Sequence, residues 1–173
     1  EGDGDFAKIT VIVPSANAET IYRKKAVWKS MTYANQGNMA EVTINTPGEL
    51  SSEIYSQIGI TAPTVVSLKV NGVINATDFT QILTNMKSLL RLDLSDCDIT
   101  EIPDNALSGK TMLKELILPS KLQVIGKNAF KDCPYLTGNL DLPITLTSIG
   151  EYAFVGTKYT SVTLPSSLKT IGD

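Results

Sequence analysis

A repeat that runs through residues 113–173 restricts the possible folds more than any other feature of this chain. The dipeptide Leu118-Pro119 returns as Leu142-Pro143 and again as Leu164-Pro165. Ile125-Gly126 returns twice with the same two steps, and Ala129-Phe130 returns once. A period in the low twenties with apolar residues at constant offsets is typical of a solenoid, in which each repeat buries its apolar side chains against its neighbours.

The leucine spacing identifies the kind of solenoid. Leu113 begins the pattern Leu-x-x-Leu-x-Leu, and the same pattern begins at Leu89, one period earlier. Val65 begins an aliphatic equivalent one further period earlier, so the repeats reach back to about residue 64. This spacing predicts an α/β solenoid: a leucine-rich-repeat array with a parallel concave sheet and an irregular or short helical convex side, preceded by an N-terminal strand–helix segment.

The sequence predicts two parts. Residues 1–36 form the strand–helix segment, and residues 37–173 form the leucine-rich-repeat domain. Within that domain, residues 37–64 are an N-terminal cap region and residues 65–173 are the repeats, which are incomplete at the C-terminus. The run Asn-Gln-Gly-Asn at residues 35–38 marks the break between the two parts, because such residues favour turns.

Local patterns predict the elements before the regular repeats. In the first part we expect a strand from Lys8 to Val13 and a helix from Ser15 or Asn17 to about Tyr33. The next segment alternates strands with helices: a strand around Val42 and Ile44, a helix over Glu49–Gln57 stopped by Gly59, a strand over Val65–Val70, and a helix over Asp78–Met86 capped by Thr77.

Composition disfavours several classes of function. The net charge of −3 and the pI of about 5.0 give no reason to expect a nucleic acid as partner. The sequence has no apolar run long enough to suggest a transmembrane segment. The chain has no histidine, the commonest general base and metal ligand. We therefore expect no enzyme, with no catalytic residue, no cofactor and no metal ligand.

Two clusters of chemically interesting residues have plainer interpretations. Cys97 and Cys133 lie more than one repeat apart, outside any Cys-x-x-Cys pair, and we expect two buried free thiols in place of a disulfide. Asp93, Asp96 and Asp98 alternate as calcium ligands do, but the run lacks the glycine and distal glutamate of an EF-hand loop. A solvated turn is the favoured interpretation.

The remaining candidate surface is the outward row of strand positions on the concave sheet, the usual binding surface of a solenoid. With the leucines pointing inward, we expect these positions to form a possible binding face: Arg91, Asp93, Glu115, Ile117, Asn139, Asp141, Ser161 and Thr163. The row has no aromatic cluster, so an ordinary solvated face is an equally good interpretation.

Residues 113–133 resemble a known family. They follow the pattern L-x-x-I-x-L-P-x-x-L-x-x-I-G-x-x-A-F-x-x-C nearly throughout, ending at Cys133, and residues 140–154 follow it again. The pattern is similar to that of BspA-type (Treponema-type) bacterial leucine-rich-repeat surface proteins. At the equivalent of Cys133 the next repeat departs from the pattern, with Gly156 nearby.

The resemblance implies a non-enzymatic bacterial protein, extracytoplasmic and either at the cell surface or secreted. Its expected role is adhesion or protein–protein interaction through the concave face, with a protein or glycan ligand. Its expected state is a monomer or weak head-to-tail association. The alternative is a structural spacer that displays another domain away from the cell surface.

The first part of the chain resembles a different portion of such proteins. Residues 9–28, with a strand ending in Val-Pro and a later tyrosine and tryptophan, are similar to the segment that usually closes an array. Two interpretations stay open: the segment ends an upstream array, which is the favoured one, or it caps the far end of this array in the same or a neighbouring molecule.

Overall fold

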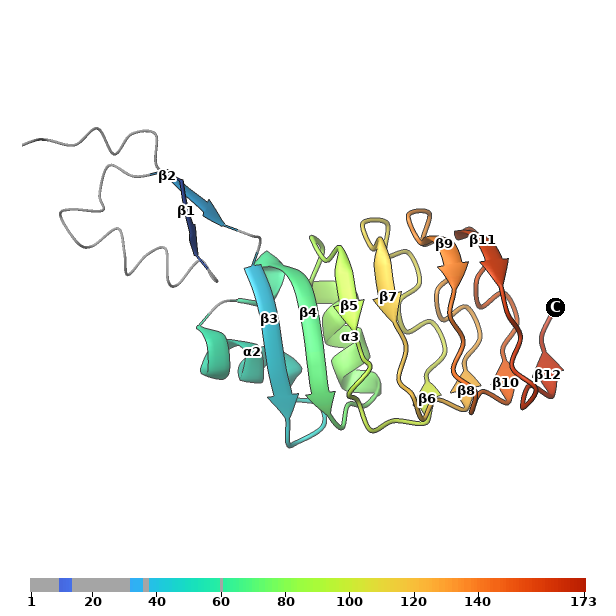
Figure 1. The fold of residues 1–173 in the computed structure, drawn as a ribbon. Helices are drawn as coiled ribbons and strands as arrows, with labels where there is room; N and C mark the ends of the chain where they lie inside the picture. Colours follow the sequence, from blue (N-terminus) through green and yellow to red (C-terminus); the bar gives the residue numbers. More distant parts are fainter. Residues whose placement is uncertain (1–9, 14–31, 36–37, 60) are drawn as a thin grey trace, which may run out of the picture.

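The computed structural model describes residues 10–13, 32–35, 38–59 and 61–173. From residue 38 onward the described chain winds as successive coils, and most coils place a strand on the same face (Figure 1). That face, which the sequence predicts to be concave, is called the front face below. The predicted architecture of parallel strands with few helices is confirmed.

The front face consists of two parallel sheets. Four strands form the first sheet in the order β3 (Asn38–Ile44), β4 (Val65–Gly72), β5 (Arg91–Asp93) and β7 (Glu115–Ile117). The second sheet consists of β9 (Thr137–Leu140) and β11 (Lys158–Val162). Pairing sets Leu68 beside Leu92 and Leu92 beside Leu116, so the repeat period stacks equivalent leucines in adjacent coils.

A second, continuous ladder runs along one edge of the coils (Figure 1). Its two-residue strands are parallel and lie in the order β6 (Glu101–Ile102), β8 (Val124–Ile125), β10 (Ser148–Ile149) and β12 (Thr170–Ile171). The recurring isoleucines pair with one another, Ile102 with Ile125 and Ile125 with Ile149. Each ladder position therefore continues through four coils without a break.

Short helices lie in the first coils of the described chain. α2 (Leu50–Ile58) ends at Gly59, as predicted, and the 3-10 helix η3 (Ala62–Thr64) precedes β4. α3 (Ala76–Asn85) begins two residues before its predicted start, and its N-cap is Asn75, so the prediction of Thr77 as cap is wrong. Asn75 and Asp78 form a capping box, in which each side chain accepts a hydrogen bond from the other's backbone N–H.

Asp78 also joins the two helices. Its fully buried carboxylate accepts hydrogen bonds from the backbone N–H groups of Gly48 (2.7 Å) and Leu50 (3.0 Å), at the start of α2. A buried carboxylate is stable only when such donors surround it, and these donors come from both helix starts. Asp78 is therefore a structural residue.

The N-terminal part contains two described strands. β1 (Thr10–Val13) lies within the predicted strand and pairs in parallel with β2 (Thr32–Asn35). The predicted helix to about Tyr33 is wrong at its end, because Thr32 and Tyr33 belong to β2. The rest of that predicted helix lies outside the described residues.

The core is a column of apolar side chains between the front face and the turns behind it. Its members include the predicted inward leucines and isoleucines, and the rings of Phe130 and Phe154 stack with centroids 5.2 Å apart. The last coil departs from the prediction: Val162, Leu164 and Ile171 are each about half exposed. That coil has a neighbour on one side only within this chain, and a solenoid position is buried by both neighbours.

Candidate binding cleft on the front face

The predicted row of outward side chains lies along β5, β7, β9 and β11. Pairing sets Arg91 beside Glu115 and Asp93 beside Ile117, and Asn139 beside Ser161. Five of the eight side chains are exposed, and Arg91 and Ile117 are half-buried. Asp93 is only 7% exposed, so its carboxylate offers a partner little surface.

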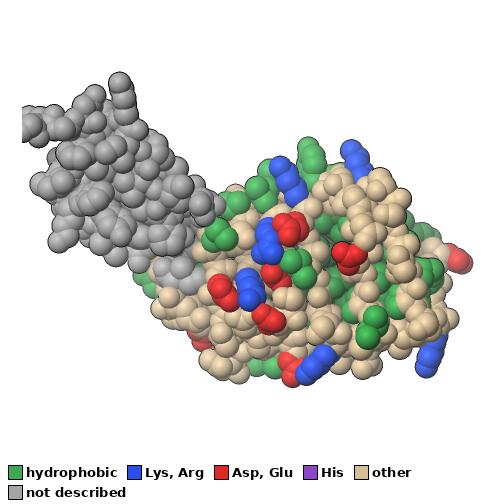
Figure 2. Space-filling model, in the orientation of Figure 1, with side chains coloured by type: hydrophobic (Ala, Val, Ile, Leu, Met, Phe, Trp, Pro, Cys, Tyr) green, Lys and Arg blue, Asp and Glu red, His purple; other side chains and the backbone are tan. Residues whose placement is uncertain are grey.

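Charged groups on the first sheet pair with one another. Lys69 on β4 forms ion pairs with Glu41 on β3 (3.2 Å) and with Asp96 beyond β5 (2.9 Å). The cluster of red and blue side chains on the front face is visible in Figure 2. These pairs bridge adjacent strands, so this half of the front face satisfies its own charges.

Arg91 forms a second set of ion pairs, which reaches β7. Its guanidinium reaches Asp93 at 3.1 Å and Glu115 at 3.0 Å. Burial acts to raise the pKa of Asp93, but hydrogen bonds from Ser95 and the charge of Arg91 outweigh it and hold that pKa below its usual range. Asp93 is therefore a fixed anion that anchors the turn after β5.

The front face is interrupted between β7 and β9. These strands belong to separate sheets, whereas β8 and β10, in the same two coils, remain paired in the second ladder. The two coils are thus held together along one edge and open on the front.

The interruption coincides with one additional residue. Leu113 and Leu136 are both fully buried and begin equivalent strands, but two residues separate Leu113 from Leu116 and three separate Leu136 from Leu140. Gly138 lies within the longer spacing and has a φ of +81°, a conformation that glycine adopts readily. β9 pairs with β11, with a register shift between Tyr159 and Ser161, but not with the regular β7.

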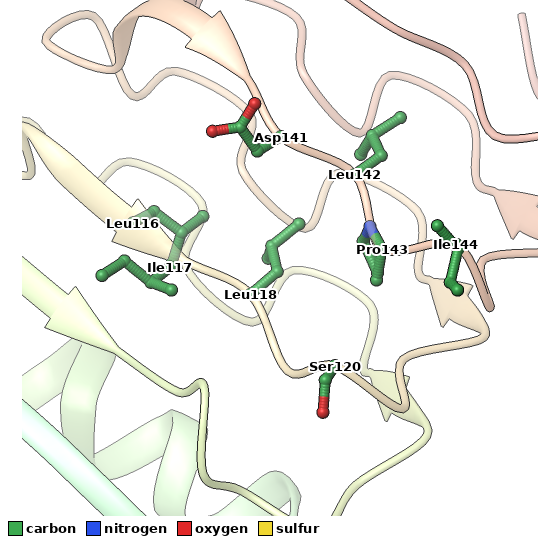
Figure 3. Close-up of a pocket in the computed structure, with 8 residues that line it drawn as sticks. All are labelled: Leu116, Ile117, Leu118, Ser120, Asp141, Leu142, Pro143 and Ile144. Carbon is green, nitrogen blue, oxygen red and sulfur yellow. The ribbon is translucent and has the colours of Figure 1, made fainter.

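Two cavities lie along this interruption. One has a volume of about 340 Å³ and is lined mainly by apolar residues beyond the ends of β7 and β9, including Leu118 and Ile144 (Figure 3). The other, of about 420 Å³, has a more polar lining that includes Lys114 and Asn139. Leu116, Ile117 and Asp141 line both, so we treat the two as one feature, the β7–β9 cleft.

The floor of the cleft is formed by leucines whose equivalents in the preceding coil belong to the core. Leu92 and Leu94 of the preceding coil are completely buried, whereas their equivalents Leu116 and Leu118 are half-buried. At the rim, Ile144 is 85% exposed. The interruption therefore converts part of the core into an accessible apolar surface, which is a typical mark of an interaction site.

Asp141 is the exposed acid that both cavities share. It accepts a hydrogen bond from the side-chain amide of Asn139, and no ion pair joins it to a lysine or arginine among the described residues. Glu115, in the polar cavity, is already held by Arg91. Asp141 is therefore available to a cation from outside.

The buried titratable groups elsewhere have structural roles. Cys97 and Cys133 are buried free thiols, as predicted, and their Sγ atoms lie 3.1 Å and 3.2 Å from the carbonyl oxygens of Val70 and Leu107. Burial raises the pKa of both, to about 12 for Cys97, so they are not thiolate nucleophiles at neutral pH.

Lys110 is a second kind of buried titratable group. Its ammonium donates to the carbonyl oxygens of Ile82 (2.8 Å) and Met86, which lie in and just beyond the last turn of α3. Burial, with a smaller effect of Lys87, lowers its pKa to about 8. A cation is favourable at the C-terminus of a helix, so Lys110 caps α3 from the next coil.

The acids considered as calcium ligands have separate local partners. Asp93 binds Ser95 and Arg91, Asp96 pairs with Lys69, and Asp98 pairs with Lys121 at 2.9 Å. Among the residues that the structure describes, no three His, Cys, Asp or Glu side chains converge as metal ligands. The described helices also include none long and apolar enough to cross a membrane.

The outward row could be named from the sequence, but the cleft within it could not. Glu115, Ile117, Asn139 and Asp141 all line the polar cavity, whereas Leu116, Leu118 and Ile144 were expected in the core or had no expected role. The available signal was the spacing from Leu136 to Leu140, one residue longer than that from Leu113 to Leu116. A glycine within the longer spacing is a typical sign of a bulge.

Comparisons with known proteins identify the family of the repeats. The model of the family described as BspA type Leucine rich repeat region (6 copies) matches residues 78–137 and 100–173, which together cover more than half of the chain. Among solved structures, the crystal structure of the T. pallidum leucine-rich-repeat protein is similar at 19% sequence identity and a TM-score of 0.49, over 96% of this chain and 70% of that one. A comparison with curated proteins finds no match.

Proposed function

Because the chain belongs to the BspA-type leucine-rich-repeat family, we propose that it is a non-enzymatic module that binds a partner protein through its front face. The proposed location is extracytoplasmic, on a bacterial cell surface or after secretion, and the proposed role is adhesion. The observation that carries the proposal is the β7–β9 cleft, where half-buried leucines and a free carboxylate adjoin exposed polar side chains.

The distribution of charge supports the same assignment. Ion pairs satisfy the front face over β3–β7, whereas Asp141 beyond β9 has no such pair among the described residues. Binding surfaces commonly combine an apolar centre with a polar rim, and the cleft with its surrounding row has that composition.

The test is a binding assay of the purified chain against immobilised extracellular-matrix proteins and against bacterial cells, read by surface plasmon resonance and cell adhesion. Replacing Arg91, Glu115 and Asn139 together by alanine is expected to abolish binding while the circular dichroism spectrum stays unchanged. The matched control replaces the exposed pair Lys127 and Glu151, which lies outside the front face, by alanine and is expected to bind normally. Loss of binding in both variants alike would contradict a front-face site.

A structural spacer is the second candidate, and the ion pairs of the first sheet favour it, because charged groups that are already paired have little left for a partner. A spacer predicts equal behaviour of the wild type and the triple variant in every binding assay. It also predicts that replacing the array by an unrelated rigid repeat of similar length leaves adhesion of the producing cell unchanged. A loss of adhesion on that replacement would exclude the spacer.

A further inference from the structure

The apolar cavity of the β7–β9 cleft is suited to a side chain. Its walls come from two facing segments, Leu116–Leu118 on one side and Leu142–Ile144 on the other, and Figure 3 shows them across a common space. Its volume of about 340 Å³ is bounded by aliphatic groups, with Asp141 and Ser120 as its polar members. Interface anchors are apolar side chains that fill such pockets.

The charge of Asp141 beside that cavity favours a cationic residue in the partner, close to the side chain that fills the cavity. Asp141 is exposed, lines both cavities and has no ion pair within the described part of the chain. A lysine or arginine from a partner would gain an ion pair here without breaking an existing one. Complementary charge of this kind gives specificity and register.

The backbone at the interruption favours a polypeptide as the occupant. The N–H of Glu115 and the C=O of Ile117 bond across to the coil of β5. Backbone groups of a strand alternate in direction, so the N–H and C=O of the intervening Leu116 point away from β5 and toward the cleft. On that edge of β7 no described strand is paired with it. An exposed strand edge is matched by the main chain of an extended peptide.

We infer that the β7–β9 cleft binds an extended polypeptide segment of the partner, with an aliphatic side chain in the apolar cavity and a lysine or arginine beside Asp141. This inference rests on the proposed binding function and adds the chemistry of the ligand. The position of the cleft makes the segment's main chain run along β7, beside Leu116.

The probe is a phage-displayed library of random peptides, selected on the immobilised wild-type chain; the enriched peptides are then synthesised and titrated by fluorescence anisotropy. We expect enriched sequences to share an aliphatic residue close to a lysine or arginine. Ile144→Ala and Asp141→Asn are each expected to weaken binding about tenfold, the size of a hot-spot loss. Both side chains are exposed, so neither change threatens the fold.

Matched controls are Val155→Ala and Glu101→Gln, which remove an exposed aliphatic group and an exposed acid outside the cleft. They are expected to leave the affinity unchanged. Deleting Gly138 provides a second approach, because Leu136 and Leu140 would then have the same spacing as Leu113 and Leu116, and we expect β9 to pair with β7. Peptide binding is expected to fall below detection in that variant, while its circular dichroism spectrum keeps the wild-type form.

Several outcomes would overturn the inference. Failure to enrich any peptide, or enriched peptides insensitive to Ile144→Ala and Asp141→Asn, would show that the cleft does not take a polypeptide. Binding of a printed oligosaccharide array that depends on Asp141 would make the cleft a glycan site. Matrix proteins could also bind the Ile144→Ala and Asp141→Asn variants normally but fail to bind the variant at Arg91, Glu115 and Asn139. In that case the inference fails while the proposed function stands.

Discussion

In the sheet of β3, β4, β5 and β7, the leucines of successive coils lie directly beside one another, and Leu68 and Leu92 are completely buried. At the next inward position along the strands the coils differ: Leu94 is completely buried, whereas its equivalents in the coils of β9 and β11 are less protected, with Leu142 half-buried and Leu164 53% exposed. Both regions follow the same sequence pattern, so composition does not explain the difference. Between β7 and β9 the difference coincides with strand spacing, because the coil of β9 has one additional residue and β9 does not pair with β7.

The comparison shows how a repeat protein can expose an apolar cleft without losing its core. The second ladder, from β6 to β12, holds the coils in place across the interruption. An irregular front strand can therefore expose leucines locally, because neighbouring coils still bury most of the column. The regular sheet supplies stability, and the irregular junction supplies accessible apolar surface.

The largest expected difference between the two regions concerns the leucine column itself. Leu92→Ala is expected to cost about 4 kcal/mol of unfolding free energy, because Leu92 is completely buried between two paired coils. Leu116→Ala, at the equivalent but half-buried position, is expected to cost about half as much. Urea denaturation of both variants measures the two values. Equal losses would mean that the β7–β9 cleft is closed in solution.

Glycine positions provide the next test. A Cβ atom on Gly72 would run into the backbone carbonyl oxygen of Ile44, whereas one on Gly138 would meet open space; both glycines have positive φ. We expect Gly72→Ala to cost about 3 kcal/mol, from a backbone clash added to strain, and Gly138→Ala about 1 kcal/mol, from strain alone. Thermal denaturation followed by circular dichroism ranks the two. The reverse order would contradict the tight packing assigned to β3 and β4.

Lys110 joins the first coils to the regular repeats, and its contribution depends on pH. Burial lowers its pKa to about 8 from 10.5, so above pH 8 the unfolded chain holds a proton that the folded chain has released. Stability assigned to this group therefore rises by about 2–3 kcal/mol as the pH increases from 8 to 10.5. The measurement is the difference in unfolding free energy between the wild type and Lys110→Met across that range. The contributions of other titrating groups cancel in this difference. A difference that stays constant with pH would contradict a buried ammonium.

Much of the fold could be predicted because the spacing of residues within each repeat determines which residues of adjacent coils pair. The repeat offsets alone place Leu92 beside Leu116 and Arg91 beside Glu115, and the strand pairing agrees. The predicted start of α3 was displaced by two residues because Thr77 also fits a cap, and only the partnership of Asn75 with Asp78 decides between them.

The end of the N-terminal helix shows where local spacing is insufficient. Thr32 and Tyr33 continue a helical pattern in the sequence, yet both lie in β2. Pairing of β1 with β2, a non-local interaction, determines their structure. Residues outside the repeat period therefore lacked the regular offsets that made the other strands predictable.

The candidate site was less predictable than the fold. Side-chain direction follows from alternation along a strand, so the outward row could be named. The low exposure of Asp93, whose carboxylate accepts hydrogen bonds from Arg91 and Ser95, does not follow from that alternation. The cleft depends on whether two particular strands pair. The additional residue near Gly138 was visible in the sequence, yet its effect on β7 follows only from the three-dimensional alignment of coils.

The smallest expected difference in unfolding free energy is between variants of two cations near β7, Arg91 on β5 and Lys114 directly before β7. Arg91 is half-buried and bridges Asp93 and Glu115, so Arg91→Met is expected to cost about 1 kcal/mol at low salt. Lys114 lines the cleft without an ion pair among the described residues, and Lys114→Met is expected to leave the unfolding free energy within a few tenths of a kcal/mol of the wild type. Urea denaturation at neutral pH measures both differences.

The Arg91 effect also has a pH signature that separates charge from packing. Because the folded-state pKa of Asp93 lies below its ordinary value of 3.8, the stability from this pair is present above that pH and is lost as the pH falls below it. Urea denaturation is therefore expected to show the wild type and Arg91→Met converging in acid. Parallel curves at neutral and acidic pH would mean that Arg91 stabilises the sheet by packing alone, and the contrast in charge between the two halves of the front face would disappear.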